Sequence, residues 1–413
     1  MLTLNYTYRI YPDATQQKQM LEWLEVCRKT YNYALRELKD WLASRKCSID
    51  RCSLEKEYII PVDTPFPSYQ LQQDNLPLAK QKYPEMALVY SQVLQTTIRR
   101  LHDTWENFQQ RGFGFPRFKK FGQFKSFLFP QFKTNPVTGQ QIKLPKIGNC
   151  LINISRPIPE GCAVKQVRVL SKARGTQWYV AITLQMDVSV PDTLVHGRAI
   201  GIDLGLETFL TTSDSLTVER PRFFRVKQGK LKLLQRRAAR KQRRSNNWEK
   251  AQIKVARMHH NIAAARKDFH LKTAHQLCDQ AQTIFAEDLN TVRLNRGMLR
   301  KDCVDAAFGQ FLSLTQWVCW KRGVYFSRVN PNGTSQTCPK CLATVQKDLA
   351  ERVHLCPECL YETHRDHAAA EMVLLRGLES LVGRDSAESK EPVGSRSAGG
   401  ESLGKRRRSR NTQ

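Results

Sequence analysis

The sequence is poor in acidic residues and has no long apolar run. Its 413 residues include 38 Asp and Glu against 66 Lys and Arg, a formal net charge of +28. No apolar run approaches the roughly 18 residues of a membrane-spanning helix, and residues 1–10 alternate like a strand rather than a secretory leader. The excess of cations is too large for a typical small-molecule enzyme. It indicates a polyanionic partner, most simply nucleic acid, with no membrane partner expected.

Cysteine is present, but without the regular spacing of a disulfide framework. Of the twelve cysteines, eight are scattered singly and four form the pairs Cys338/Cys341 and Cys356/Cys359. Scattered thiols are typical of a reducing compartment. Two Cys-x-x-Cys pairs separated by fourteen residues can supply four thiolates to one tetrahedral, structural Zn²⁺. Disulfides, or four unrelated buried thiols, are the alternatives.

Helical periodicity dominates the first part of the chain. Apolar residues spaced by three and four predict two amphipathic helices, one capped by Asp13 and the other running from Leu94 to Phe108. Residues 45–85, rich in Pro, Asp, Ser and Gln, are expected to be irregular. Together, residues 13–117 are predicted to form a helical domain.

Short alternating runs follow and predict antiparallel strands. They extend from Phe127 to Val190, and the strand predicted at residues 2–10 could complete a small β-barrel with them. The predicted barrel domain therefore comprises residues 1–12 and 118–195.

Aromatic residues alternate with cations between residues 112 and 132. Aromatic faces can stack on bases while neighbouring cations bind phosphates, so Arg117, Lys119 and Lys120 are candidate nucleic-acid contacts. The alternative is a loop whose aromatics fill a junction between domains.

The densest block of positive charge lies between residues 225 and 257. It holds thirteen Lys or Arg and one acid, Glu249, on two predicted long helices joined near Ser245. Cations four residues apart on a helix repel one another, and a phosphate backbone relieves that repulsion. A merely solvated face is the alternative. The candidate contacts are Arg236, Arg237, Arg240, Lys241, Arg243 and Arg244.

Three acids stand where buried elements are expected. Asp203 interrupts the apolar run Ala199–Leu206, and Glu287 ends a second buried-looking strand. A buried carboxylate is costly unless it is paired or binds a metal, although an acid at a strand end can simply face water. Asp366 follows the second cysteine pair and opens an amphipathic helical run, where a capping role is the alternative.

In a ribonuclease-H-like domain, elements of this kind meet at one edge of a mixed sheet. Asp203, Glu287 and Asp366 could then hold two Mg²⁺ or Mn²⁺ ions about 4 Å apart, one preparing the attacking water and one stabilising the leaving 3′ oxygen of a phosphodiester. Hard oxygen ligands suit these ions, whereas the soft thiolates suit zinc. Spacing alone does not establish that the three acids converge.

A multidomain α+β fold follows from these segments. The predicted α/β nuclease domain comprises residues 196–334 and 363–378, including basic helices over 225–275. A zinc ribbon, residues 335–362, is inserted into it. Residues 379–413 lack apolar periodicity and are predicted to be a disordered basic tail.

Several short segments within residues 5–376 resemble, in the same order, the TnpB (OrfB) family encoded by bacterial insertion sequences and related to type V CRISPR nucleases. They are Tyr8–Pro12, Cys27–Leu35, Gly114–Lys119, Gly201–Gly205, Glu287–Leu289, Thr334–Cys338 with its cysteine partners, and Arg365-Asp366.

The resemblance implies a wedge β-barrel, a helical recognition domain and a RuvC nuclease domain split by the zinc ribbon. It also implies a guide RNA, double-stranded target DNA cut beside a short target-adjacent motif, and a bacterial cytoplasmic, nucleoid-associated protein. The RuvC triad maps onto Asp203, Glu287 and Asp366.

One departure from the family lies beside the last acid. The family usually reads Asp-Arg-Asp-x-Asn-Ala-Ala, whereas this chain has His364, Asp366 and Ala368 at the first, third and fifth positions. The triad is intact, but an amide beside the metals is missing. Three functions therefore stay open: an RNA-guided endonuclease, a strand-transfer transposase, and a guided repressor that does not cleave.

Overall fold

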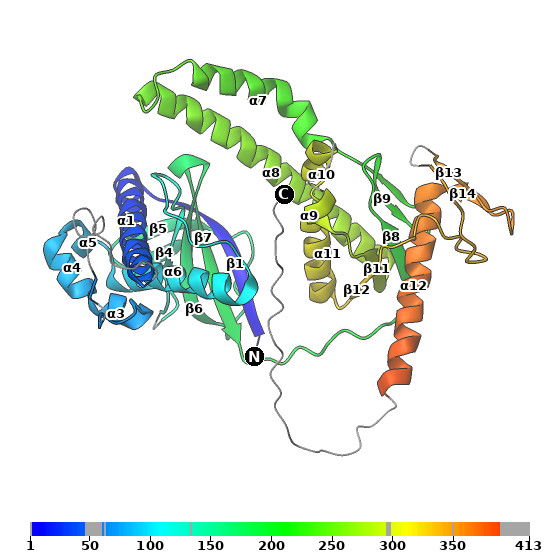
Figure 1. Cartoon of the computed structure of the whole chain (residues 1–413), viewed down its shortest axis with the longest axis horizontal. Helices are drawn as coiled ribbons and strands as arrows, with labels where there is room; N and C mark the ends of the chain where they lie inside the picture. The colour runs from blue at the N-terminus through cyan, green and yellow to red at the C-terminus, as the bar shows by residue number, and fades with distance from the viewer. Residues whose placement is uncertain are drawn as a thin grey trace, which may run out of the picture. The chain divides into compact units, whose positions relative to one another are not determined.

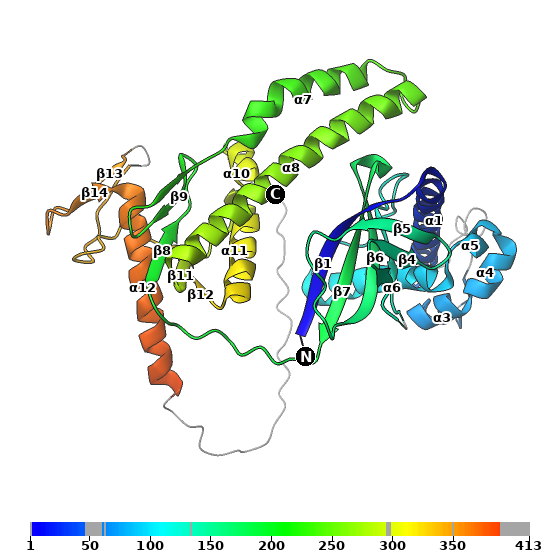
Figure 2. The same cartoon turned by 180° about the vertical axis from the view of Figure 1, so that it is seen from behind.

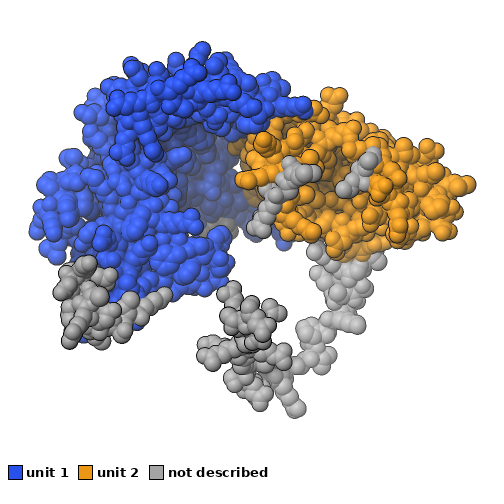
Figure 3. All heavy atoms as spheres, turned by 45° about the horizontal axis from the view of Figure 1, so that its top comes forward, with its two compact units in different colours: residues 1–192, 224–265 blue, residues 193–223, 266–413 orange. Residues whose placement is uncertain are grey.

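The computed structural model of the chain describes residues 2–45, 60–61, 63–132, 134–294, 299–348 and 351–388. Two compact units, distinguished by colour in Figure 3, comprise Met1–Asp192 with Phe224–Ala265 and Thr193–Phe223 with Arg266–Gln413. Within the described ranges, no helix combines the length and apolar character needed to cross a membrane.

The first unit is built on a seven-stranded antiparallel sheet. Its order is β2-β6-β7-β1-β5-β4-β3, so the N-terminal strand lies inside the sheet, as its alternating pattern predicted. No ladder between described residues joins the edges β2 and β3, so the ring of hydrogen bonds expected of a closed barrel is not formed. The strands are β1 (Leu2–Tyr11), β2 (Ser126–Phe129), β3 (Val137–Thr138), β4 (Gln141–Leu144), β5 (Gly148–Asn153), β6 (Ala163–Lys172) and β7 (Gln177–Met186).

Helices α1 (Ala14–Ser44) and α6 (Ser91–Arg111) pack with this sheet around one apolar core (Figure 1). Asp13 caps α1 as predicted. Its side chain accepts a hydrogen bond from the backbone amide of Gln16, and the side chain of Gln16 accepts one from the backbone amide of Asp13. The Trp23 ring of α1 lies 5.5 Å from the Phe127 ring of β2. The core thus joins the helices to the sheet.

The expectation of an irregular segment at residues 45–85 is wrong for its second half. That half contains α3 (Tyr69–Asp74) and α4 (Leu76–Lys82), and α5 (Glu85–Leu88) begins at its end. These helices are too short to show a repeating apolar period, which is why composition alone suggested a loop. Residues 46–59 lie outside the described residues.

The predicted basic helices are α7 (Phe223–Ala239) and α8 (Asn246–Gln280), which run side by side as a hairpin in Figures 1 and 2. Leu231 and Ala238 of α7 pack with Val255 of α8. The first unit contains α8 as far as Ala265, and the second contains the remainder. In the first unit, Arg174 of the 3₁₀ turn η1 (Ala173–Gly175) forms a 2.8 Å ion pair with Glu249.

The second unit is built on a mixed five-stranded sheet of order β10-β9-β8-β11-β12. β8 forms a hairpin with β9 and pairs in parallel with β11, which pairs in parallel with β12. The central strands are apolar along their length because helices cover both faces. The strands are β8 (Ala199–Asp203), β9 (Thr208–Thr212), β10 (Thr217–Glu219), β11 (Thr283–Glu287) and β12 (Tyr325–Val329).

The end of α8 and α11 (Phe308–Arg322) contribute to the core on one face of this sheet, and α12 (Arg365–Glu388) packs against the strands from the other (Figures 1 and 2). Two short helices, α9 (Thr291–Leu294) and α10 (Arg300–Ala306), lie between β11 and α11 in the chain. The disorder expected from residue 379 is wrong as far as Glu388, because α12 continues to that residue. The remaining tail lies outside the described residues.

Helix α12 approaches its sheet closely enough to require glycine. A methyl group added at Gly377 would overlap the buried Phe285 ring of β11, whereas one added at Gly229 of α7 would meet no atom within 4 Å. Both glycines lie in helix interiors, where alanine is intrinsically favoured.

We therefore expect Gly377→Ala to lower the free energy of unfolding by about 1–3 kcal/mol through overpacking. Gly229→Ala is the matched control and should stabilise by about 0.5–1 kcal/mol. Denaturant unfolding of the full-length variants measures both. Equal effects of the two substitutions would contradict the close packing of α12.

Candidate metal centres and nucleic-acid surface

Asp203 and Glu287 end two neighbouring parallel strands. Ile202 of β8 pairs with Ala286 of β11, so the acids that follow these residues lie side by side at one edge of the sheet. Asp366 lies in the first turn of α12, which packs along β8. Because α12 begins at Arg365, Asp366 is not the helix cap that was one reading of the sequence.

The Asp203 carboxyl is influenced by the charges of the other two acids. Burial, followed by the charges of Glu287 and Asp366, raises the pKa of Asp203 to about 8. Burial also raises the pKa of Glu287, despite a hydrogen bond from Thr334 and the charge of Arg376. The structure therefore brings the three predicted acids near one another. The electrostatic free energy of this arrangement becomes less favourable when all three are ionised.

The donor set at this edge fits divalent cations that prefer oxygen. Neither Asp203 nor Glu287 forms an ion pair with any residue in the described ranges. A buried carboxylate cluster without a directly ion-paired cation is stabilised by bound metal, and carboxylate oxygens suit Mg²⁺ or Mn²⁺.

A residue that sequence reasoning missed orients Glu287. Thr334 is 3 % exposed, and its hydroxyl donates to Glu287 Oε1. The neighbouring loop is held by Arg376 of α12, which donates to the carbonyls of Asn330 and Asn332 at 3.0 and 2.7 Å. An isolated threonine has no periodic pattern, so its role could not be read from spacing. The one available signal was its position at the start of the segment that leads to Cys338.

The departure from the family pattern lies close to Asp366. His364 Nδ1 is 4.0 Å from Asp366 Oδ2, and the side chain of His364 is half-exposed. His367 faces β9, with Nδ1 3.2 Å from the Thr212 carbonyl. Ala368 is 2 % exposed within α12, so an asparagine there would need additional space in a packed region.

The four predicted zinc ligands converge on one point. Their Sγ atoms all lie within 4.8 Å of one another, with Cys338–Cys359 at 3.6 Å and Cys341–Cys356 at 3.4 Å. Tetrahedral coordination with Zn–S bonds of about 2.3 Å requires S···S separations of about 3.8 Å. The geometry fits one zinc ion. The backbone amide of Cys359 is the main cause that lowers the pKa of Cys356 to about 7, which favours its thiolate.

Two matching turns present these cysteines. In the first, the Leu342 amide donates to the Cys338 carbonyl; in the second, the Leu360 amide donates to the Cys356 carbonyl. Leu342 and Leu360 both have left-handed backbones, with φ of 62° and 58°. Repetition of this turn, despite the unfavourable φ of a non-glycine residue, directs both sulfur pairs toward one site.

The cysteine cluster is attached to α12, the helix that carries Asp366. Its hairpin of β13 (Val353–Leu355) and β14 (Glu362–His364) ends immediately before the helix. Glu371 of α12 accepts from the Tyr361 hydroxyl at 2.7 Å and pairs with Lys340 at 3.3 Å. Folding of the cysteine turns is therefore coupled to the position of Asp366.

If the cluster holds structural zinc, Cys356→Ser should release the metal and lower the thermal stability of the second unit. Cys162→Ser is the matched control, because Cys162 is partly buried outside the cluster. Elemental analysis should find about one zinc per chain in the wild type and in Cys162→Ser. A wild-type protein with far less than one zinc would exclude this site.

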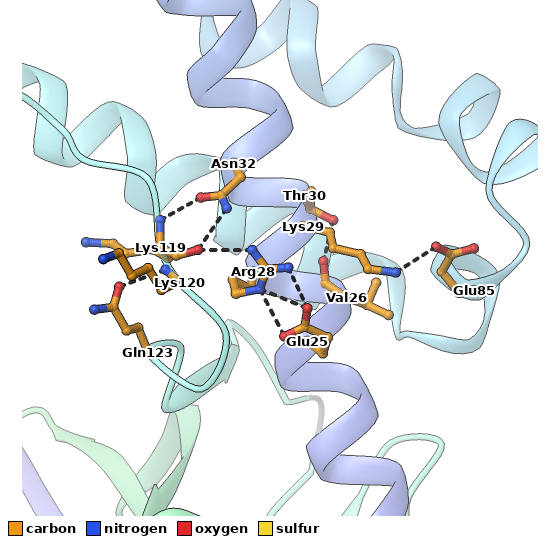
Figure 4. Close-up of polar contacts among 10 residues, drawn as sticks. All are labelled: Glu25, Val26, Arg28, Lys29, Thr30, Asn32, Glu85, Lys119, Lys120 and Gln123. Atoms are coloured by element: carbon orange, nitrogen blue, oxygen red, sulfur yellow. Dashed lines mark hydrogen bonds and ion pairs between the residues drawn. The ribbon is translucent and has the colours of Figure 1, made fainter. Parts of the chain in front are cut away.

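The predicted aromatic and basic segment is attached firmly to α1 (Figure 4). Asn32 donates to the Lys119 carbonyl at 2.9 Å and accepts from the Lys119 amide at 2.8 Å, while Arg28 donates to the same carbonyl at 3.0 Å. Phe115 packs against the ring of Trp105 at 5.5 Å, whereas the side chains of Phe113, Phe118 and Phe121 are exposed. The segment thus packs one ring into the core of the first unit and presents three others to solvent, and its predicted contact with nucleic acid stays a prediction.

The six predicted cations near the tip of the α7–α8 hairpin are exposed, and none forms an ion pair with a described residue. The single acid of the block, Glu249, is already paired with Arg174. The positive charge of the hairpin is therefore not neutralised by its own unit.

Three family models match the chain. The OrfB_IS605 model, described as "Probable transposase", matches residues 182–296, and the Cas12f1-like TNB domain matches residues 308–373. The helix-turn-helix domain of OrfB_IS605 proteins matches residues 1–47, where this structure has β1 and the single helix α1.

Curated relatives agree with these models. The protein "Putative RNA-guided DNA endonuclease InsQ" of Escherichia coli (strain K12) is 31% identical over 323 residues, covering 73% of this chain and 78% of the relative. The chain belongs to the OrfB (TnpB) family. A second member, "Putative RNA-guided DNA endonuclease" of Streptomyces pristinaespiralis, is 29% identical over 389 residues, covering 90% of this chain and 89% of the relative.

Solved structures are more distant from this OrfB-family chain. A Cas12f1-sgRNA-target DNA complex aligns at 14% identity with a TM-score of 0.33, covering 91% of this chain and 99% of that chain. A CRISPR-Cas12f ternary complex aligns at 13% identity with a TM-score of 0.34, covering 87% of this chain and 82% of that chain.

Proposed function

We propose that the protein is an RNA-guided DNA endonuclease that hydrolyses phosphodiester bonds at the edge formed by Asp203, Glu287 and Asp366. The observation that carries this proposal is the buried Asp203 carboxyl, whose pKa is raised by burial and by the charges of Glu287 and Asp366, with no cationic side chain ion-paired to Asp203 or Glu287 among the described residues. The curated relatives bear the same functional name, which supports it.

The topology of the second unit supports a RuvC-type, ribonuclease-H-like assignment. Its sheet runs β10-β9-β8 in antiparallel order and then continues with β11 and β12 in parallel. In this arrangement the first and fourth strands along the chain lie side by side, and their adjacent ends carry Asp203 and Glu287. The helix that follows the cysteine insert carries the third acid.

Within this site, the chain's own residues provide charge and orientation. Bound divalent ions would supply Lewis-acid stabilisation of the attacking and leaving oxygens. Asp203 must lose its proton to act as a ligand, because its pKa is raised to about 8. Thr334 fixes one oxygen of Glu287 by hydrogen bonding and leaves the other available.

Guide RNA and target DNA would be held by positive charge outside this edge. The unpaired cations of the α7–α8 hairpin suit a phosphate backbone, and Arg117, Lys119 and Lys120 lie beside exposed rings that can stack on bases. A short motif beside the target would be read in the DNA duplex. The zinc ribbon would hold Asp366 in position through α12.

The other two functions predict different products. A strand-transfer transposase would join DNA ends, a reading favoured by the description of the matching family model. A guided repressor would bind its target without cutting, a reading favoured by the loss of the family's amide at Ala368.

The proposal is tested with the full-length protein and the RNA that copurifies with it. Asp203→Asn, Glu287→Gln and Asp366→Asn should each abolish cleavage of complementary DNA, and their effects should not add, because the three residues act as a unit. Mg²⁺ or Mn²⁺ should support cleavage, whereas Ca²⁺ should support only the binding of target DNA. Asp288→Asn is the matched control and should cut normally, since Asp288 is exposed and paired with Arg328.

Unimpaired cleavage by Asp366→Asn would refute the triad. Joined DNA ends from the wild type would favour the transposase, and guided binding without any cut would favour the repressor.

A further inference from the structure

A small polar pocket in the first unit lies between α6 and the β2 edge of the sheet, far along the chain from the acids. Its volume is about 130 Å³, several times the roughly 30 Å³ that one water occupies in the liquid. Arg99 and Arg100 of α6, Ser126 of β2 and Arg168 of β6 contribute to its lining. We call it the α6–β2 pocket.

Two of its guanidinium groups have no acidic partner. The side chain of Arg168 forms no hydrogen bond or ion pair with any described residue, and the polar partner of the Arg100 side chain is the Ser126 hydroxyl at 3.4 Å. Partial burial, and then the charge of Arg168, lower the pKa of Arg100. Two neighbouring cations with most of their N–H donors unfilled favour an anion placed between them.

The remaining polar groups agree with an anion site. Asp103 also lines the pocket, but it pairs with Arg99 at 3.2 Å. Because Ser126 accepts from Arg100, its own hydroxyl proton remains free to donate. Thr97 contributes no donor, since its hydroxyl donates to the Val93 carbonyl at 2.8 Å.

The pocket continues the aromatic and basic segment attached to α1. Arg100 lies 4.8 Å from the centre of the Phe124 ring, and that ring lies 6.0 Å from the Tyr31 ring. Lys119 lies on Tyr31, at 5.4 Å from its ring centre. Tyr31 and Phe124 are buried, so their rings hold the cations in place and do not stack on bases; the series of cations from Lys119 to Arg168 suits a phosphate backbone.

We propose that the α6–β2 pocket binds one backbone phosphate of a nucleic acid, between Arg100 and Arg168. This inference rests on the proposed function, because it requires a nucleic-acid partner. The phosphate could belong to the guide RNA or to target DNA, and two arms of one experiment distinguish these sources.

The test measures how affinity depends on salt for the wild type, Arg100→Gln/Arg168→Gln and the control Arg99→Gln. One arm titrates RNA-free full-length protein with the RNA that copurifies with the wild type. The other titrates the assembled ribonucleoprotein with a DNA duplex of complementary sequence. The salt slope is the slope of the logarithm of the binding constant against the logarithm of the salt concentration. Its magnitude should be smaller in the double variant by about 0.7 if the phosphate is on single-stranded RNA, or by about 0.9 if it is on duplex DNA.

Arg99→Gln should keep the wild-type slope, because Arg99 is already neutralised by Asp103. The double variant should also unfold at the wild-type temperature or above it, since it removes like-charge repulsion. Unchanged slopes in both arms would overturn the pocket, and guided cleavage by the same wild-type preparation would show that the nuclease proposal survives. If the double variant has the reduced slope but the wild-type protein cuts no DNA, the result would instead support the phosphate site and contradict the nuclease proposal.

Discussion

The gathering of three acids at one sheet edge, where Asp203 is buried beside the charges of the other two, is the main electrostatic constraint on the second unit. Asp203 and Glu287 are adjacent because β8 and β11 pair in parallel, and Asp366 is nearby because α12 packs closely on β8. Burial and neighbouring negative charge both raise the pKa of Asp203, so the fold alone makes this edge unfavourable. Bound cations would convert the same arrangement into a stable one.

Elements away from the acids serve to keep them there. Thr334 donates to Glu287, and Arg376 of α12 anchors the loop that precedes Thr334. The cysteine turns reach α12 through Glu371. In the first unit, by contrast, the notable feature is positive charge without internal partners, on the α7–α8 hairpin and in the α6–β2 pocket. One unit gathers acids where we propose that metals bind, and the other presents cations that we propose contact phosphates.

Several of these features could be predicted from particular residues. Asp203 interrupted an apolar run, Glu287 ended one, Asp13 stood before a helical period, and the cysteines had metal spacing, so each had a local signal. The short helices α3, α4 and α5 had no repeat long enough to detect, and the continuation of α12 to Glu388 had no apolar signal. The Thr334 hydrogen bond and the proximity of Arg168 in β6 to Arg100 in α6 are tertiary features, which no local pattern encodes.

The most direct test of the coupled carboxylates is the number of protons released when Mg²⁺ binds the zinc-loaded, nucleic-acid-free protein. Calorimetric titration in two buffers of different ionisation enthalpy measures it. With the pKa of Asp203 raised to about 8, this carboxyl holds a proton in roughly nine-tenths of molecules at pH 7 and roughly one-tenth at pH 9. The account predicts release of about one proton at pH 7, falling toward zero at pH 9. Binding without proton release at pH 7 would contradict it.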